Sequence, residues 1–162
     1  MGEVATGSLR EVLICEIDGG RYAFPSASIR EILRAATVAP LPRAPGVVEG
    51  ALNIRGEIVP VLDIRRRLRL PPRAMGMSDH LVVVALHGRS AAVRVDRAVQ
   101  LAGIAPEAIE HAGGLDPARP GADEVARTPD GLLVFIDLAA LVTAEDLDTG
   151  DVETPEAGGQ RR

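Results

Sequence analysis

Short apolar runs alternate with turn residues along most of the chain. The apolar run Val12–Ile17 meets Asp18-Gly19-Gly20 and is followed by a second apolar segment, Tyr22–Phe24, which predicts a β-hairpin. The same pattern predicts three further hairpins, at residues 50–63, 80–96 and 124–138, with turns at 55–57, 87–89 and 130–131. Residues 99–104 predict one more strand.

Two segments have a different period. In PSASIREILR (25–34), Ile29, Ile32 and Leu33 fall at i, i+3 and i+4 behind Pro25, which predicts a short helix of about two turns. A closing helix is expected at 137–147. Three prolines in residues 37–46 predict an edge strand or an extended crossing segment, and residues 112–123 read as a surface loop.

Eight to ten short strands with little helix favour a barrel or sandwich over a βαβ architecture. The strands form two groups around the Pro71-Pro72 loop, so we expect an all-β fold of two small barrels packed together and divided roughly around residues 70–80. The single domain is expected at 10–147, between a flexible N-terminus (1–9) and a disordered acidic tail (148–162).

Composition narrows the function. Hydrophobic residues make up 46% of the chain and can supply a packed interior. A net charge of −5, with two Phe, one Tyr and no Trp, argues against binding of nucleic acid, which relies on basic and aromatic side chains. Every basic residue is arginine, which excludes a Schiff-base lysine and the P-loop lysine. With no secretory signal and no apolar run near the roughly 20 residues that span a bilayer, a soluble cytoplasmic protein without direct membrane insertion is expected.

Catalytic and metal-binding patterns are absent from the sequence. Cys15 lies within a strand that is expected to be buried, where a thiol is inert. The histidines His80, His87 and His111 fall at strand ends, turns or loops, without metal-ligand spacing. We therefore predict no enzyme activity, no cofactor and no metal site.

The basic cluster RRRLR (65–69) has two interpretations. It is either a docking site for nucleic acid or an acidic partner helix, or the exposed face of a helical turn whose Leu68 packs inward. The net charge favours the structural interpretation or an acidic protein partner over nucleic acid.

The segment Asn53-Ile54-Arg55-Gly56 is more specific. Asn53 is the only asparagine in the chain, and asparagine suits strand ends where its amide bonds the backbone or φ is positive. Arg55 has two candidate partners, Glu31 and Glu57, and Glu31 also fits a helix capping box with Ser28. The sequence leaves these alternatives open.

Three segments in this order, YAFPSASIREILR, LPRAPGVVEGALNIRGEIVPVLDIRRRL and GLLVFIDLAALV, resemble the CheW family of chemotaxis coupling proteins. The resemblance covers roughly residues 13–142. It implies two intertwined five-stranded SH3-like barrels and a non-catalytic scaffold that links the cytoplasmic tip of chemoreceptors to the regulatory domain of the histidine kinase CheA. Receptor helices would dock in an apolar groove between the barrels. The kinase domain would dock barrel to barrel.

The resemblance also implies roles for particular residues. Ile29 matches an apolar groove-side position, and Glu31 with Arg55 matches a structural ion pair that braces the short helix against the turn. The resulting docking candidates are Ile29, Gly50, Asn53, Arg55 and Gly56. We expect a monomer that is recruited to membrane-associated or soluble receptor arrays. The alternative is a CheW-like adaptor in a pathway with another output, such as pilus motility, development or second-messenger control.

Overall fold

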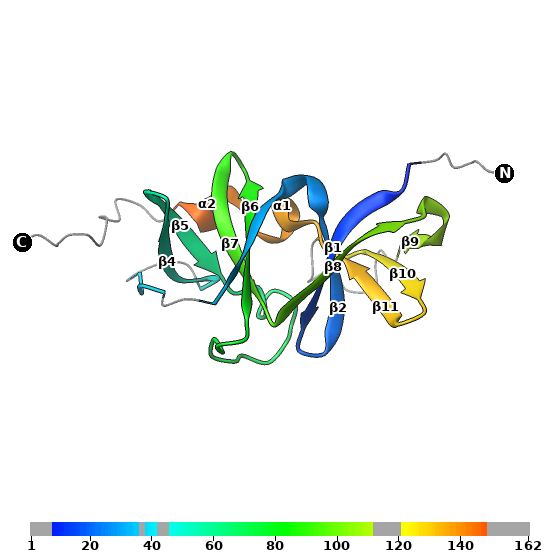
Figure 1. The fold of residues 1–162 in the computed structure, drawn as a ribbon, viewed down its shortest axis with the longest axis horizontal. Helices are drawn as coiled ribbons and strands as arrows, with labels where there is room; N and C mark the ends of the chain where they lie inside the picture. Colours follow the sequence, from blue (N-terminus) through cyan, green and yellow to red (C-terminus); the bar gives the residue numbers. More distant parts are fainter. Residues whose placement is uncertain (1–7, 36–37, 42–45, 112–120, 149–162) are drawn as a thin grey trace, which may run out of the picture.

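The structure is a computed structural model that describes residues 8–35, 38–41, 46–111 and 121–148 (Figure 1). Residues 1–7 of the expected flexible N-terminus, the acidic tail after Asp148 and most of the loop at 112–123 lie outside these ranges. The strands are β1 (Arg10–Ile17), β2 (Gly20–Pro25), β3 (Ile29–Arg34), β4 (Val48–Ile54), β5 (Glu57–Leu62), β6 (His80–Leu86), β7 (Arg89–Val95), β8 (Arg97–Ile104), β9 (Ile109–His111), β10 (Glu124–Thr128) and β11 (Gly131–Phe135). The helices are the 3₁₀ turns η1 (Ser26–Ser28) and η2 (Pro106–Ala108), and the short α-helices α1 (Leu138–Leu141) and α2 (Ala144–Leu147).

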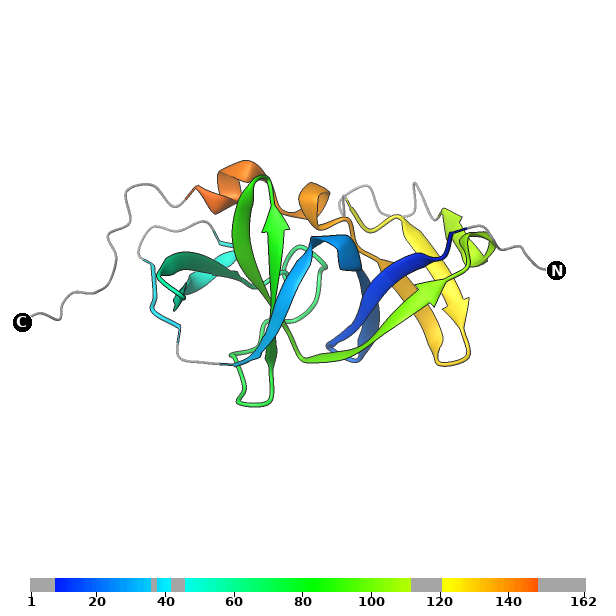
Figure 2. The same cartoon turned by 45° about the horizontal axis from the view of Figure 1, so that its top comes forward.

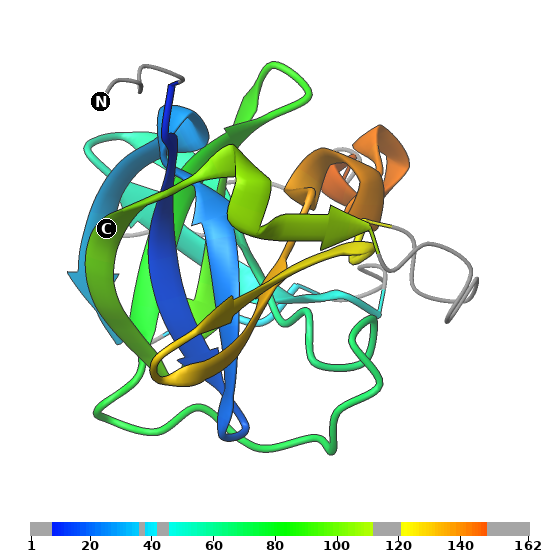
Figure 3. The ribbon, with the colours of Figure 1, turned by 90° about the vertical axis from the view of Figure 1, so that its right-hand side faces the viewer.

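These strands form two mixed sheets, as the predicted all-β class requires. The six-stranded sheet has the order β8-β1-β2-β11-β10-β9, and the five-stranded sheet has the order β3-β6-β7-β5-β4. The first sheet therefore contains one strand more than expected. Its end strands β8 and β9 are consecutive in the chain and are joined by η2, so one bent segment supplies both end strands of the sheet (Figure 3).

The five-stranded sheet is closed by a single β-bridge. Ala39, a few residues after the end strand β3, exchanges two backbone hydrogen bonds of 2.8 and 3.0 Å with Ala51 of the other end strand, β4. A Cβ atom at Gly50 would overlap Val38 and the carbonyl oxygen of Ala39. Glycine at position 50 is therefore what lets the two backbones approach. Within the expected crossing segment at 37–46, Ala39 is thus paired with the end strand β4.

The chain passes between the sheets through η1, which joins β2 to β3, and through Asp96, which joins β7 to β8. The loop that contains Pro71 and Pro72 connects β5 to β6 within one sheet. The expected division around residues 70–80 therefore does not coincide with a change of sheet.

The helix predicted at 25–34 is wrong. After the single turn η1, residues 29–34 form β3, which pairs with β6. The register shifts between Ile29 and Glu31, so that Ile29 and Ile32 both face the same side of the sheet despite their spacing of three. Because of this bulge, apolar residues on one face of β3 have the sequence spacing that is expected of a helix. The capping box also fails to form, because the Ser28 hydroxyl donates to the Pro25 carbonyl at 3.1 Å.

The predicted hairpins are confirmed, and three of them share one kind of turn. Residues 18–19, 55–56 and 87–88 each have φ between 50° and 87°, and each pair links two antiparallel strands. Positive φ at both central residues defines a type I′ turn, whose twist matches that of the flanking strands. Glycine at the second position adopts this conformation without steric cost.

Three apolar clusters hold the fold together. Each sheet encloses one, and the largest, here called the inter-sheet core, lies between the sheets. Strand β1 contributes Val12 and Ile14 to the core of the six-stranded sheet, and Leu13, Cys15 and Ile17 to the inter-sheet core. Burial on both faces is why its sequence is continuously apolar rather than alternating.

The predicted closing helix is two short helices, α1 and α2, joined by Val142 and Thr143. We call residues 138–148 the strap, because it follows the six-stranded sheet and lies against the five-stranded one (Figure 1). Its apolar side chains Leu138, Leu141 and Leu147 complete the inter-sheet core. Within the described ranges, no helix has the length and apolarity needed to cross a membrane.

Candidate docking surface

The β4–β5 turn contains most of the residues singled out in the sequence. The Asn53 side-chain oxygen accepts the Gly56 N–H at 2.9 Å and so fixes the turn from within. Arg55, whose side chain is 70% exposed, forms an ion pair with Glu31 of β3, and not with Glu57. Because β3 and β4 are the two ends of the five-stranded sheet, this ion pair spans its seam. The residue that Arg55 braces therefore lies on a strand, and not on a helix.

Ile29 lies apart from that turn. Its register partner is Val84, which belongs to the inter-sheet core, whereas Glu31 pairs with Val83 of the core within the five-stranded sheet. The two residues therefore point to opposite faces of β3. The structure brings Glu31, Asn53, Arg55 and Gly56 together at the seam, and places Ile29 at the junction of the two sheets.

At this junction, apolar side chains extend the inter-sheet core to the surface. Ile32 of β3 pairs with Val82 of the inter-sheet core and is 42% exposed. Leu101 of β8 pairs with Leu13 of the same core and is 71% exposed. We call Ile29, Ile32 and Leu101 the inter-sheet strip.

Strands β3 and β8, which carry the strip, are end strands of their sheets and both face the viewer in Figure 2. They are linked through β6: Arg34 of β3 pairs with His80, and His80 Nδ1 accepts the Ala98 N–H of β8 at 3.0 Å. Exposed apolar residues that continue a core and are contributed by two sheets are typical of a protein-binding surface.

A pocket of about 390 Å³ opens beside the Ile29 end of the strip. It is lined from both sheets and from the strap, by Pro25, Ala27, Ser28, Ala85, Leu86, His87, Asp137, Leu138 and Ala139. The junction between the sheets is therefore hollowed next to η1, which fits a surface that receives a protruding side chain.

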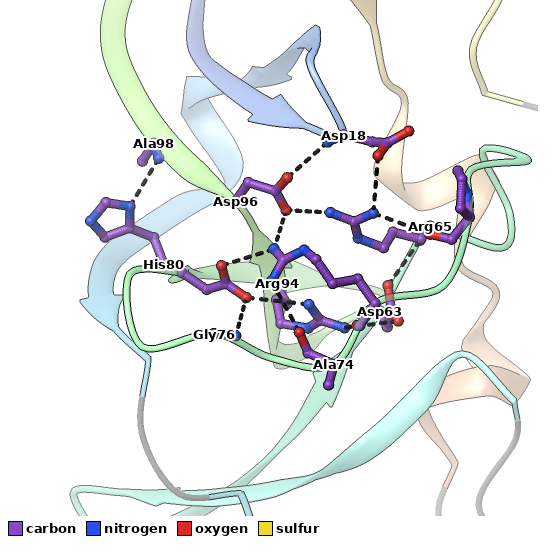
Figure 4. Close-up of polar contacts among 12 residues, drawn as sticks. Asp18, Asp63, Arg65, Ala74, Gly76, His80, Arg94, Asp96 and Ala98 are labelled. Atoms are coloured by element: carbon purple, nitrogen blue, oxygen red, sulfur yellow. Dashed lines mark hydrogen bonds and ion pairs between the residues drawn. The ribbon is translucent and has the colours of Figure 1, made fainter.

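An ion network, which the sequence did not predict, fixes one sheet against the other (Figure 4). Asp96, at the crossover from β7 to β8, accepts hydrogen bonds from Arg65 and Arg73 at 2.6 Å each, and from the Asp18 backbone N–H at 2.8 Å. Burial alone would raise the pKa of Asp96, but these hydrogen bonds outweigh it and lower the pKa. Since Asp18 belongs to the β1–β2 turn and Arg65 follows β5, the network joins both sheets.

Arg94 forms the second half of the network (Figure 4). We call the whole network, with both halves, the inter-sheet clamp. The Arg94 side chain is 2% exposed and contacts the carboxylates of Glu49, Asp63 and Asp79 at 2.5, 3.0 and 3.3 Å. The Arg73 carbonyl accepts a further hydrogen bond at 2.7 Å. A lone arginine in the apolar run AAVRV of β7 was the signal in the sequence, but its carboxylate partners are far away along the chain.

The basic cluster at 65–69 is therefore not a uniform exposed face. Leu68 packs inward as predicted, but Arg65 is also buried, at 3% exposure. Arg67 pairs with Asp146 of the strap at 2.8 and 3.0 Å, and lowers the pKa of Asp146 to about 2. Together with Arg89, which donates to the Leu147 carbonyl at 2.7 Å, it fastens the strap to the five-stranded sheet.

Groups with reactive side chains are engaged in structural contacts. Burial raises the pKa of Cys15 to about 12, so its thiol stays protonated and unreactive at neutral pH. His80 and His87 each form a hydrogen bond with a backbone group. Among the residues that the structure describes, no group of three or more His, Cys, Asp or Glu side chains is placed to hold a metal ion.

Known proteins match both the sequence and the fold. The CheW-like domain family matches residues 11–146. The chain is 23% identical over 145 residues to the chemotaxis protein CheW of Bacillus subtilis, which covers 88% of this chain and 92% of the relative. It is 40% identical over 63 residues to the protein FrzA of Myxococcus xanthus, although this match spans only 39% of either chain.

A solved structure supports the same assignment of fold. The scaffolding protein TtCheW of Thermoanaerobacter tengcongensis superimposes with a TM-score of 0.75 at 22% identity, and the match covers 82% of this chain and 92% of that one.

Proposed function

Because the chain belongs to the CheW-like domain family, we propose that it is a non-catalytic adaptor that couples chemoreceptors to a CheA-type histidine kinase. Relatives that it matches over most of their length are named chemotaxis protein CheW. The observation that carries the proposal is the inter-sheet strip, an apolar surface to which both sheets contribute. An adaptor needs surfaces and not a catalytic centre, and the buried state of Cys15 supports this assignment.

The receptor partner is assigned to the inter-sheet strip. A helix that lays an apolar face along Ile32 and Leu101 would remove both side chains from water, and burial of each contributes about 1 kcal/mol given that they are already partly covered. Helices dock in this way through residues at i, i+3, i+4 and i+7. Ile29 and the pocket beside it extend the same surface toward η1.

The kinase partner is assigned to the seam of the five-stranded sheet. The β4–β5 turn, with Asn53, Arg55 and Gly56, projects a rigid tip whose shape is set by the Asn53 hydrogen bond and the Glu31 ion pair. Gly50 contributes indirectly, because it permits the closure of that sheet. Recruitment to receptor arrays follows if both surfaces are occupied together.

Calorimetric titration against two partners from the same organism tests the proposal: a receptor signalling-tip fragment and the regulatory domain of the CheA kinase. We expect Ile32→Asp to weaken receptor binding at least tenfold while kinase binding is retained, since a charge would be forced into an apolar contact. Leu132→Asp is the matched control, because Leu132 is 54% exposed but lies on β11, away from the strip.

Circular dichroism would verify that both variants fold. Equal loss of receptor binding in both variants, or none in either, would remove the strip as the docking surface. A folded wild-type protein that binds neither partner would contradict the adaptor role itself.

A further inference from the structure

Two charged residues whose side chains have no partner among the described residues flank the inter-sheet strip. Arg34 of β3 pairs in register with His80, so it lies on the same face as Ile32, and Glu11 of β1 lies on the same face as Leu13. Both are exposed, and neither side chain forms a hydrogen bond or an ion pair with another residue that the structure describes. This is unusual here, because many of the other arginines are paired with carboxylates.

The two charges lie at opposite ends of the strip. Arg34 is next to His80, whose ring accepts the Ala98 N–H at the start of β8. Glu11 pairs with Gly103, near the end of β8, and the next residue, Val12, pairs with Pro25, which directly precedes η1. The strip therefore runs from a negative end at Glu11 to a positive end at Arg34.

Its length matches a short stretch of helix. Because of the bulge in β3, the β6 partners of Ile29 and Arg34, Val84 and His80, are only four residues apart, and they span about 13 Å at roughly 3.3 Å per residue. That distance corresponds to between two and three helical turns at about 5.4 Å each, or about nine residues. A helix that follows the strip brings its side chains on one face past both charges.

We propose that Arg34 and Glu11 set the direction in which a partner helix lies along the strip. The partner is an amphipathic helix with an acidic side chain that meets Arg34 and a basic side chain, between two and three turns away, that meets Glu11. This inference rests on the proposed function, since it assumes that the strip receives a helix. In the opposite direction, both charged contacts become like-charged, so the preference between the two directions is expected to be about tenfold.

The probe is a designed antiparallel helical hairpin with one displayed arm. That arm carries apolar residues at i, i+3 and i+7, Glu at one end, Lys at the other, and a nitroxide label beside the Glu. The hairpin is added to the ¹⁵N-labelled full-length protein. The broadening of the amide signals of Ala98 and Gly103 then reports which end of the strip the nitroxide label occupies. We expect the Ala98 signal to broaden much more than the Gly103 signal.

Exchange of the charges is the decisive variant. In the double variant Glu11→Arg/Arg34→Glu, the broadening should move to Gly103, whereas Arg127→Glu, an exposed arginine of β10, should leave it at Ala98. A hairpin with Gln at both ends should bind with both signals broadened. If the charged hairpin binds the wild-type protein without a directional preference, or the exchange does not reverse it, the inference is overturned while docking on the strip stands. If no hairpin binds, the docking proposal fails together with it.

Discussion

Arg94 is the residue whose removal should reveal how much the buried half of the inter-sheet clamp stabilises the fold. Its guanidinium is almost fully buried and faces three carboxylates, of which Asp79 is itself only 3% exposed. In Arg94→Met, Glu49 and Asp63 can turn toward water, since each is 25% exposed, but Asp79 cannot. Removing one member of a buried ion pair costs about 3–5 kcal/mol because the other charge is orphaned. Arg73 still contacts Asp79 at 2.9 Å, which places the expected loss near the lower end, at about 3 kcal/mol.

Urea unfolding followed by circular dichroism measures this loss. A domain with a free energy of unfolding of about 5–15 kcal/mol should still fold after it. Arg97→Met is the matched control: Arg97 pairs with Glu16 at 2.9 Å, but the side chains are 57% and 32% exposed, so the expected loss is about 0–1 kcal/mol. The double variant Arg94→Met/Asp79→Asn should regain about 1–2 kcal/mol over Arg94→Met, because it removes the orphaned charge. A loss no larger in Arg94→Met than in Arg97→Met would refute the reasoning, as would a double variant less stable than the single one.

Two further changes test the strap and the seam. The pKa of Asp146 is lowered from 3.8 to about 2 by Arg67, so this pair stabilises the fold fully above the ordinary pKa and its contribution is lost as the pH falls through about 2. Asp146→Asn should therefore lower the free energy of unfolding by about 1–2 kcal/mol at pH 7, and a gap to the wild type that does not shrink between pH 4 and pH 2 would contradict this account. Gly50→Ala should cost about 2–4 kcal/mol in the same unfolding assay, because its Cβ would overlap backbone. Gly103→Ala, whose Cβ would meet only the flexible side chain of Leu9 at 2.8 Å, should cost less than about 1 kcal/mol, and similar losses in both would count against the closure by Gly50.

The sequence predicted the elements whose signals are local. The turn pairs at 18–19, 55–56 and 87–88 combine a glycine with flanking apolar runs, and all three form the expected hairpins. Strand β3 was predicted as a helix, because the bulge beside Arg30 places Ile29 and Ile32 on one face at a helical spacing. No local pattern distinguishes that bulge from a turn of helix; only the pairing with β6 does.

The candidate site was predicted in part for the same reason. The partners Glu31 and Arg55 were named together because the resemblance placed them at matching positions, and the structure pairs them. The inter-sheet clamp was missed, because Asp18, Arg65 and Asp96 come from distant segments and meet only when the two sheets pack. Leu101 was likewise missed, since an exposed leucine in a strand carries no signal until its neighbours are known.

The position of the clamp explains how the inter-sheet strip can present a defined surface. Asp96 is the last residue before β8, and Leu101 lies five residues further along the same strand. Ile32 lies on β3, which is fixed to β6, and β6 begins directly after Asp79 of the clamp. The two exposed apolar side chains of the strip therefore come from different sheets. The strand of Leu101 begins directly after Asp96, and the strand of Ile32 pairs with a strand that begins directly after Asp79. Buried ion pairs are often no more stabilising than an apolar core, but they demand one geometry. In this fold, that demand fixes the spacing of β3 and β8, and a helix that binds across both strands meets a surface that is already in place.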